Sequence, residues 1–110
     1  MKKNRHLEQI SNGYYNLGLS LAKERNLSSA LNALSISLGL NKKNTDARNL
    51  YGLIQFEMGE ETKALISWVI SININPINNP AQNYLQKLRN KSSYLEKSQE
   101  AISKYNKAIS

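Results

Sequence analysis

A spacing of 34 residues, at which the sequence matches itself, constrains the fold of this chain more than any other feature. The matched positions hold small or apolar residues: Gly18 and Gly52, Ala30 and Ala64, Leu31 and Leu65, Leu34 and Trp68, and Ser37 and Ser71. A fixed period of this length is typical of arrays of helical hairpins, in which each unit buries its apolar face against its neighbours. The period therefore predicts an all-helical binding scaffold.

Apolar residues at helical spacing outline a first pair of helices. One stripe predicts a helix over about 5–25, and its members are Leu7, Ile10, Tyr14, Leu17 and Leu21. Asn26 is expected in the turn, with Ser28 or Ser29 close to the N-cap of a second helix. That second helix continues through Leu38 and closes between Gly39 and Asn44.

A second pair follows the same plan. Thr45 or Asp46 suits an N-cap, the stripe that follows holds Leu50, Tyr51, Ile54 and Met58, and Gly59 permits a left-handed turn at the helix end. The partner helix ends before Pro76, because proline cannot donate the amide that a continuing helix requires. The segment 70–74 is rich in β-branched residues, but its match to 36–40 favours helix.

The last third of the chain predicts two more helices. Pro80 suits the first turn of a short helix that carries Tyr84, Leu85 and Leu88 and runs to a polar break at 90–93. A final helix from about 94 to the end places four apolar residues on one face: Leu95, Ile102, Tyr105 and Ile109. The whole chain therefore predicts about six helices.

Composition limits the classes of function. With 110 residues and 40% hydrophobic residues, the chain suits one compact domain. The absence of cysteine excludes disulfides and thiolate chemistry, and the single histidine, His6, offers a metal no second partner. No apolar run approaches the roughly 18 residues of a membrane span, so a soluble cytoplasmic domain is expected. We expect no catalytic, cofactor or metal site, and hence no enzyme.

The net charge of +7 is confined to the ends of the chain, since residues 7–78 hold six basic and six acidic side chains. Basic ends suit nucleic acid, and this alternative would use eight residues as phosphate contacts: Lys2, Lys3, Arg5, Lys87, Arg89, Lys91, Lys104 and Lys107. The neutral repeat body disfavours it relative to a solvated polar surface.

Residues 11–78 resemble two tetratricopeptide repeats, which are helix-turn-helix units of 34 residues. In the first unit the resemblance rests on 14–18, Tyr-Tyr-Asn-Leu-Gly, with Ala30 twelve residues after the glycine. In the second unit it rests on Gly52, Gly59, Ala64, Trp68 and the pair Asn75-Pro76. The resemblance implies a right-handed superhelix of antiparallel helix pairs, an α-solenoid, that binds peptides or partner proteins.

The resemblance divides a single domain, 1–110, into repeat 1 at 11–44, repeat 2 at 45–78, and an atypical third unit or capping helices at 79–110. Gln86 and Ser98 occupy the glycine and alanine slots of the third unit. Either Ala101, Tyr105 and Ala108 mark the second helix of a lengthened third repeat, or 105–110, which echoes 15–20, begins a fresh repeat. We expect the last helix to pack on 79–91 or on a second copy, as a homodimer.

Ligands of this family lie along a concave surface of the first helices of each repeat. The positions that correspond here are Asn12, Tyr15, Asn16, Leu19, Lys23, Asp46, Asn49, Leu50, Leu53, Phe56 and Glu57. Their spacing places each set on one helix face. In the alternative reading, Leu50 and Leu53 pack between helices and the asparagines are merely solvated. Tyr14, Tyr51 and Trp68 are expected in the core.

These residues favour a scaffold that binds a peptide or partner segment, of unidentified sequence, in the groove. A receptor for acidic chaperone tails is disfavoured, because Tyr15, Leu19 and Leu50 stand where that subclass has a lysine and two asparagines. The remaining alternatives are the nucleic-acid-associated repeat and a structural module that only self-associates.

Overall fold

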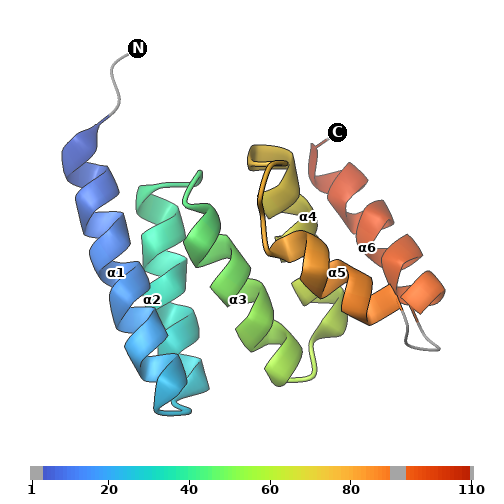
Figure 1. The fold of residues 1–110 in the computed structure, drawn as a ribbon, viewed down its shortest axis with the longest axis horizontal. Coiled ribbons are helices and arrows are strands. Elements are labelled where there is room, and N and C mark those ends of the chain that lie inside the picture. Colours follow the sequence, from blue (N-terminus) through green and yellow to red (C-terminus); the bar gives the residue numbers. More distant parts are fainter. Residues whose placement is uncertain (1–3, 90–93, 110) are drawn as a thin grey trace.

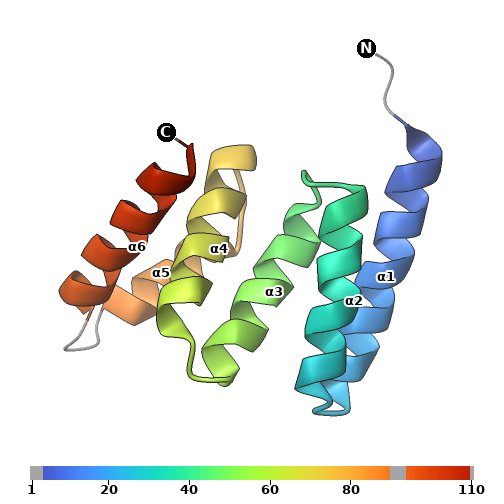
Figure 2. The ribbon, with the colours of Figure 1, turned by 180° about the vertical axis from the view of Figure 1, so that it is seen from behind.

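The computed structural model describes residues 4–89 and 94–109, and the regular secondary structure within them is entirely helical. The six helices are α1 (Arg5–Lys23), α2 (Leu27–Leu40), α3 (Thr45–Glu57), α4 (Glu61–Ile74), α5 (Ala81–Arg89) and α6 (Tyr94–Ile109). Helices α1 to α4 follow one another across the molecule in chain order, and α5 lies in front of α4 (Figure 1); the view from behind shows α1 beside α2, α3 beside α4, and α6 on the other side of α4 (Figure 2). The predicted all-helical fold class is confirmed for these residues.

The helix boundaries lie within a few residues of those predicted, and the turns explain the differences. The N-cap of α3 is Asn44, whose Oδ1 accepts from the amide of Ala47 at 3.1 Å, so the prediction of Thr45 or Asp46 is wrong by one or two residues. Asn26, not a serine, is the N-cap of α2. Gly59 has the predicted positive φ, +82°.

Small residues allow the helices of each pair to cross closely, as the sequence predicted. A Cβ on Gly18 would lie 2.8 Å from Leu34 Cγ, and a Cβ on Gly52 would lie 2.8 Å from Trp68 Cδ1 and nearer still to Trp68 Nε1. Ala30 and Ala64 are fully buried. The large side chain of the second helix therefore fills the space that each glycine leaves free.

Two hydrophobic clusters form the core. The first lies among α1, α2 and α3, and its buried members are Ala30, Leu34, Leu38, Ala47 and Ile54. The second lies among α4, α5 and α6, with Leu53 and Phe56 of α3 packed against it, and its buried members are Ala64, Leu65, Trp68, Ala81, Leu88 and Ala101. The interior is thus divided into two parts, and α3 contributes to both.

Buried hydrogen bonds join the first pair of helices to the start of α3. Ser11 and Ser37 each donate a hydroxyl to the other's carbonyl oxygen, at 2.8 and 2.7 Å. Asn44 Nδ2 donates to Ser11 Oγ at 3.0 Å and to Asn12 Oδ1 at 3.1 Å. Ser37, which is fully buried, therefore has a structural role.

A second network repeats this arrangement between α3, α4 and the start of α5. Asn79 Nδ2 donates to Ser71 Oγ at 2.9 Å, and its Oδ1 accepts from the amide of Ala81 at 3.0 Å and from Asn49 Nδ2 at 2.9 Å. Asn79 is 5% exposed. Since a buried polar group without a partner costs free energy, this asparagine fixes the position of α5.

We expect Asn79→Ala to lower the free energy of unfolding by about 1–3 kcal/mol, because it leaves Asn49 Nδ2 and the amide of Ala81 without their acceptor. Urea denaturation followed by circular dichroism measures the loss. Asn83→Ala, at an exposed position of α5, is the control and should change stability little. Equal stability of the two variants would contradict a structural role for Asn79.

The apolar stripe predicted for the first helix does not face the core along its whole length. Leu7 is 37% exposed and Leu17 48% exposed, whereas Ser11 and Gly18 are buried toward α2. The residues that allow close approach to α2 are small, so the large apolar residues point elsewhere. Tyr14, which was expected in the core, lines a surface hollow instead.

The last helix packs mainly on α4, with fewer contacts to α5, which corrects the expectation that it packs back on 79–91. Ala101 is buried in the second cluster, and the Tyr105 hydroxyl accepts from Asn73 Nδ2 of α4 at 3.1 Å. Ile102 is 54% exposed. The side chains of Leu95 and Ile109 lie outside the part of the chain that the structure describes.

Candidate binding cleft

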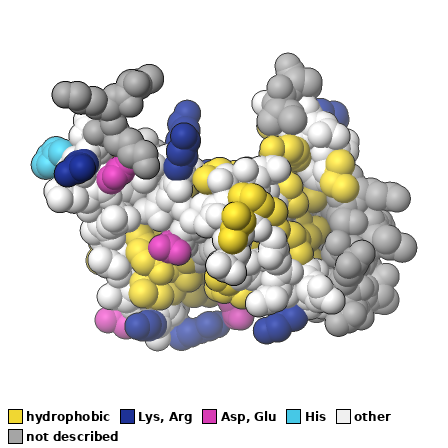
Figure 3. All heavy atoms as spheres, turned by 45° about the horizontal axis from the view of Figure 1, so that its top comes forward, with side chains coloured by type: hydrophobic (Ala, Val, Ile, Leu, Met, Phe, Trp, Pro, Cys, Tyr) yellow, Lys and Arg dark blue, Asp and Glu magenta, His cyan; other side chains and the backbone are white. Residues whose placement is uncertain are grey.

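A cleft of about 230 Å³ lies between α3 and α5, with α4 beneath it. We call it the α3–α5 cleft, and the residues that line it are Leu53, Phe56, Glu57, Trp68, Tyr84, Lys87 and Leu88. Figure 3 shows hydrophobic side chains gathered in patches over the left and the centre of the molecule, with charged side chains along its lower edge. The cleft combines an apolar floor with two charged side chains.

Three aromatic rings, one from each helix, form the floor of the cleft. The ring centroids of Phe56 and Trp68 are 6.1 Å apart, and those of Trp68 and Tyr84 are 5.3 Å apart, with tilted planes in both pairs. Trp68 is only 2% exposed, and its indole Nε1 donates to the carbonyl oxygen of Asn49 at 3.4 Å. Rigid aromatic surface of this kind is typical of binding hot spots, because few rotamers are lost on contact.

Glu57 and Lys87 supply the charges of the cleft. Glu57 also pairs with Arg25, from the turn between α1 and α2, at 3.3 Å between Oε2 and Nη2. Both partners are more than half exposed, so this ion pair contributes little to stability. The Glu57 carboxylate can therefore bind a polar ligand at a modest cost in free energy, because little is lost when its pairing with Arg25 is broken.

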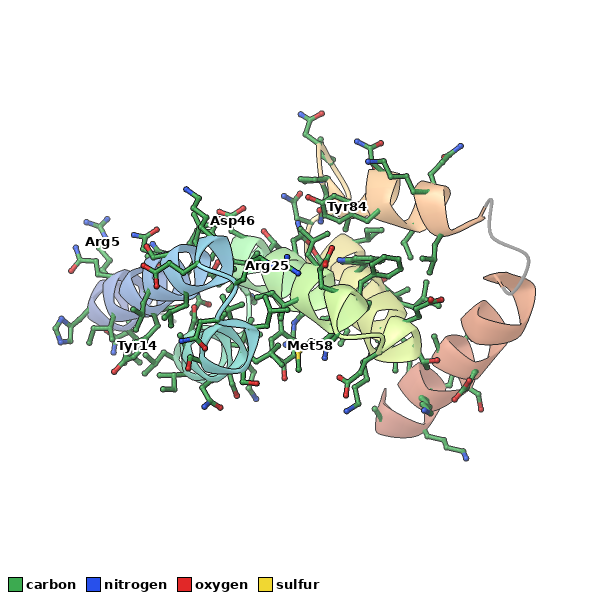
Figure 4. All side chains as sticks on the ribbon, turned by 90° about the horizontal axis from the view of Figure 1, so that it is seen from below. Arg5, Tyr14, Arg25, Asp46, Met58 and Tyr84 are labelled. Atoms are coloured by element: carbon green, nitrogen blue, oxygen red, sulfur yellow. The ribbon has the colours of Figure 1, made fainter. Side chains whose placement is uncertain are left out.

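Tyr15 lies on α1, and its hydroxyl is influenced electrostatically by Asp46 of α3 and Tyr84 of α5. Partial burial raises the pKa of the Tyr15 hydroxyl, and negative charge on Asp46 and on Tyr84 raises that pKa further. Figure 4 shows Asp46 and Tyr84 on the same side of the row of helices. Asp46 of α3 and Tyr84 of α5 therefore face the same side of the molecule.

The structure brings only part of the predicted groove together at this cleft. Leu53, Phe56 and Glu57 line it. Elsewhere on the surface Asn16, Lys23 and Asp46 are exposed, and Tyr15 and Leu19 are half-buried.

The other predicted residues have structural contacts. Asn49 is 7% exposed and donates to Asn79, so it stabilises the interior rather than offering its amide to a ligand. Asn12 is exposed but accepts from Asn44. Leu50 packs against the first core cluster and Leu53 against the second, in agreement with the alternative reading of these leucines.

The sequence prediction of the groove missed Trp68, Tyr84, Lys87 and Leu88. Trp68 was correctly predicted as core, and it also closes the bottom of the cleft. Tyr84, Lys87 and Leu88 are spaced by three and one residues. Tyr84 and Leu88 belong to the apolar stripe predicted for the third unit, and this stripe could have identified them as part of the groove. Because Gln86 occupies the glycine slot, the resemblance did not extend the groove to the third unit.

No family model, curated protein or solved structure matches this chain. The tetratricopeptide resemblance therefore stays a prediction, carried by the 34-residue period and by the residues at the helix crossings.

Within residues 4–89 and 94–109, no helix combines the length and the hydrophobicity that crossing a membrane requires. The same residues include no group of three or more histidine, cysteine, aspartate or glutamate side chains that could hold a metal ion.

Proposed function

We propose that this chain is a non-enzymatic protein-interaction scaffold of the tetratricopeptide kind, a short α-solenoid that acts in the cytoplasm. The ligand is a segment of a partner protein that inserts an apolar side chain into the α3–α5 cleft. The observation that carries the proposal is the cleft itself, an aromatic floor between the first helices of two successive units.

The arrangement of charge around the floor supports an extended segment as the ligand. Glu57 and Lys87 lie on α3 and α5, on the two walls of the cleft. A peptide backbone has donors and acceptors along its length, so one wall suits its amide groups and the other its carbonyl groups. The apolar anchor supplies most of the affinity and the two charges set the orientation.

The alternatives make different predictions. A nucleic-acid-associated repeat would use the basic ends, and its affinity would fall steeply with added salt. Of those residues, Lys104 already pairs with Glu100 at 3.1 Å. A homodimer through the C-terminal helix would use the exposed side of α6, where Ile102 lies. The apolar cleft favours the peptide scaffold over both.

Peptides selected from a random displayed library against the wild-type chain test the proposal. We expect Tyr84→Ala and Phe56→Ala to weaken the selected peptides by about tenfold or more, since loss of a hot-spot side chain costs above 1 kcal/mol. Fluorescence anisotropy of a labelled peptide measures the affinity. Lys87→Glu, at an exposed position, should alter peptide preference without affecting the fold.

Met58→Ala is the matched control, because Met58 directly follows α3, is 42% exposed and does not line the cleft. Thermal unfolding of each variant separates loss of binding from loss of folding. Peptides that bind the three cleft variants as tightly as wild type would overturn the proposed site.

A further inference from the structure

The outward side of α1 carries an apolar hollow of about 280 Å³ lined by Ile10, Gly13, Tyr14 and Leu17. We call this surface the α1 face. Leu17 is 48% exposed, and nothing lies within 4 Å of the position that a Cβ on Gly13 would occupy. Figure 4 shows Tyr14 on the opposite side of the row of helices from Tyr84, so the α1 face is separate from the α3–α5 cleft.

The 34-residue repeat allows the α1 face to be compared with the equivalent face of α3. A shift of 34 residues converts the lining of the hollow into Asn44, Ala47, Arg48 and Tyr51 of α3. There the face is closed by the first helical pair: Ala47 is fully buried and Asn44 is 7% exposed. Tyr51 packs against the first core cluster. The same face is thus an interface between helices on α3 and is open on α1.

The residues on the α1 face determine what can cover it. On α3 the face is partly polar, and Asn44 Nδ2 donates to Ser11 Oγ and to Asn12 Oδ1. On α1 the corresponding residue is Ile10, and Tyr14 replaces Arg48. A helical pair that docked on α1 as α1 and α2 dock on α3 would place its buried serine against Ile10, and the hydrogen bond that Asn44 Nδ2 donates to Ser11 Oγ would have no counterpart. Stacking of copies in the repeat register is therefore disfavoured.

We propose that the α1 face is covered by the α1 face of a second copy, in a two-fold symmetric homodimer. A two-fold interface brings the same patch of both subunits together, so an apolar patch meets an apolar patch and no polar group is stranded. Gly13 lies at the middle of the hollow, where the absence of a side chain lets the two helix backbones approach. The interface leaves the α3–α5 cleft of each copy open.

Polar side chains at the two ends of the face favour an antiparallel crossing of the two α1 helices. His6 and Glu24 continue the face by steps of three and four residues, His6 before Ile10 and Glu24 after Leu21. Both are exposed in the single chain. An antiparallel pair places the imidazole of one copy toward the carboxylate of the other, whereas a parallel pair places like ends together.

The first test is the mass of the chain in solution, measured by light scattering after size-exclusion chromatography. We expect the mass of two chains for wild type and of one chain for Leu17→Glu, with unchanged helicity. Ile77→Glu, at a site 70% exposed and outside the α1 face, is the control and should stay dimeric. A monomeric wild type, or a Leu17→Glu variant that remains dimeric, would overturn the proposal.

Single cysteines locate the interface independently, because the chain has no cysteine of its own. Gly13→Cys and Gly39→Cys are a matched pair, since both glycines are exposed, helical and free of neighbours within 4 Å of a Cβ. We expect Gly13→Cys to form disulfide-linked dimers several-fold faster than Gly39→Cys under mild oxidation. Equal rates would exclude the α1 face as the dimer interface. That result would be obtained if a dimer used α6, if another partner covered α1, or if the face stayed open.

Discussion

Replacing Trp68 with alanine is expected to lower the free energy of unfolding by about 3–5 kcal/mol. Trp68 is 2% exposed and packs in the second core cluster, and its ring fills the space opposite Gly52. Removal of the indole leaves a cavity among three helices that the remaining side chains cannot close. It also removes the donor to the Asn49 carbonyl.

A loss of this size is a large part of the 5–15 kcal/mol that ordinary domains possess, so partial unfolding at room temperature is expected. Urea denaturation followed by far-ultraviolet circular dichroism measures it without relying on the missing fluorophore. Ile36→Ala is the control, since Ile36 of α2 is 46% exposed. If the two variants unfolded at the same urea concentration, Trp68 could not be the centre of the second cluster.

Gly52→Leu should also lower the free energy of unfolding, by on the order of 1–3 kcal/mol, through overpacking instead of a cavity. A Cβ alone would lie 2.8 Å from Trp68 Cδ1, so the leucine must displace the indole or separate α3 from α4. Gly39→Ala provides the contrast. At this exposed helical position with free space, alanine should stabilise the chain by up to about 1 kcal/mol.

The comparison of these two glycine variants by urea denaturation isolates packing from helix propensity, since both replacements favour helix. Gly52→Leu unfolding at the same urea concentration as wild type would rule out the close crossing of α3 and α4. Because that crossing is the physical basis of the 34-residue period, the repeat assignment would be lost with it.

The period and the apolar spacing predicted the helices because both depend on local and nearest-neighbour packing. Gly18 and Gly52 identified the helix crossings, because each glycine is followed at the same spacing by a large residue, Leu34 or Trp68, that fills the space beside it. Pro76 and Gly59 marked helix ends for reasons that act within a single turn. These features could therefore be predicted from residues that lie close together in the sequence.

The remaining features depend on contacts that the spacing does not encode. The stripe through Leu7 and Leu17 has helical period, but period alone does not say which side of a helix meets its neighbour. Asn49 was predicted as a groove residue because of its position, whereas its hydrogen bond to Asn79 lies across 30 residues. The packing of α6 on α4 likewise arises after the regular period has ended.

We propose that a partner segment occupies the α3–α5 cleft, and Trp68 can report on this binding, because it is the only tryptophan of the chain and lines the cleft. Its indole N–H gives a single resonance in a nitrogen-15 correlation spectrum. We predict that titration with a library-selected peptide shifts this resonance together with the backbone amides of Phe56 and Tyr84. Saturable binding that leaves the Trp68 resonance unmoved would contradict the claim.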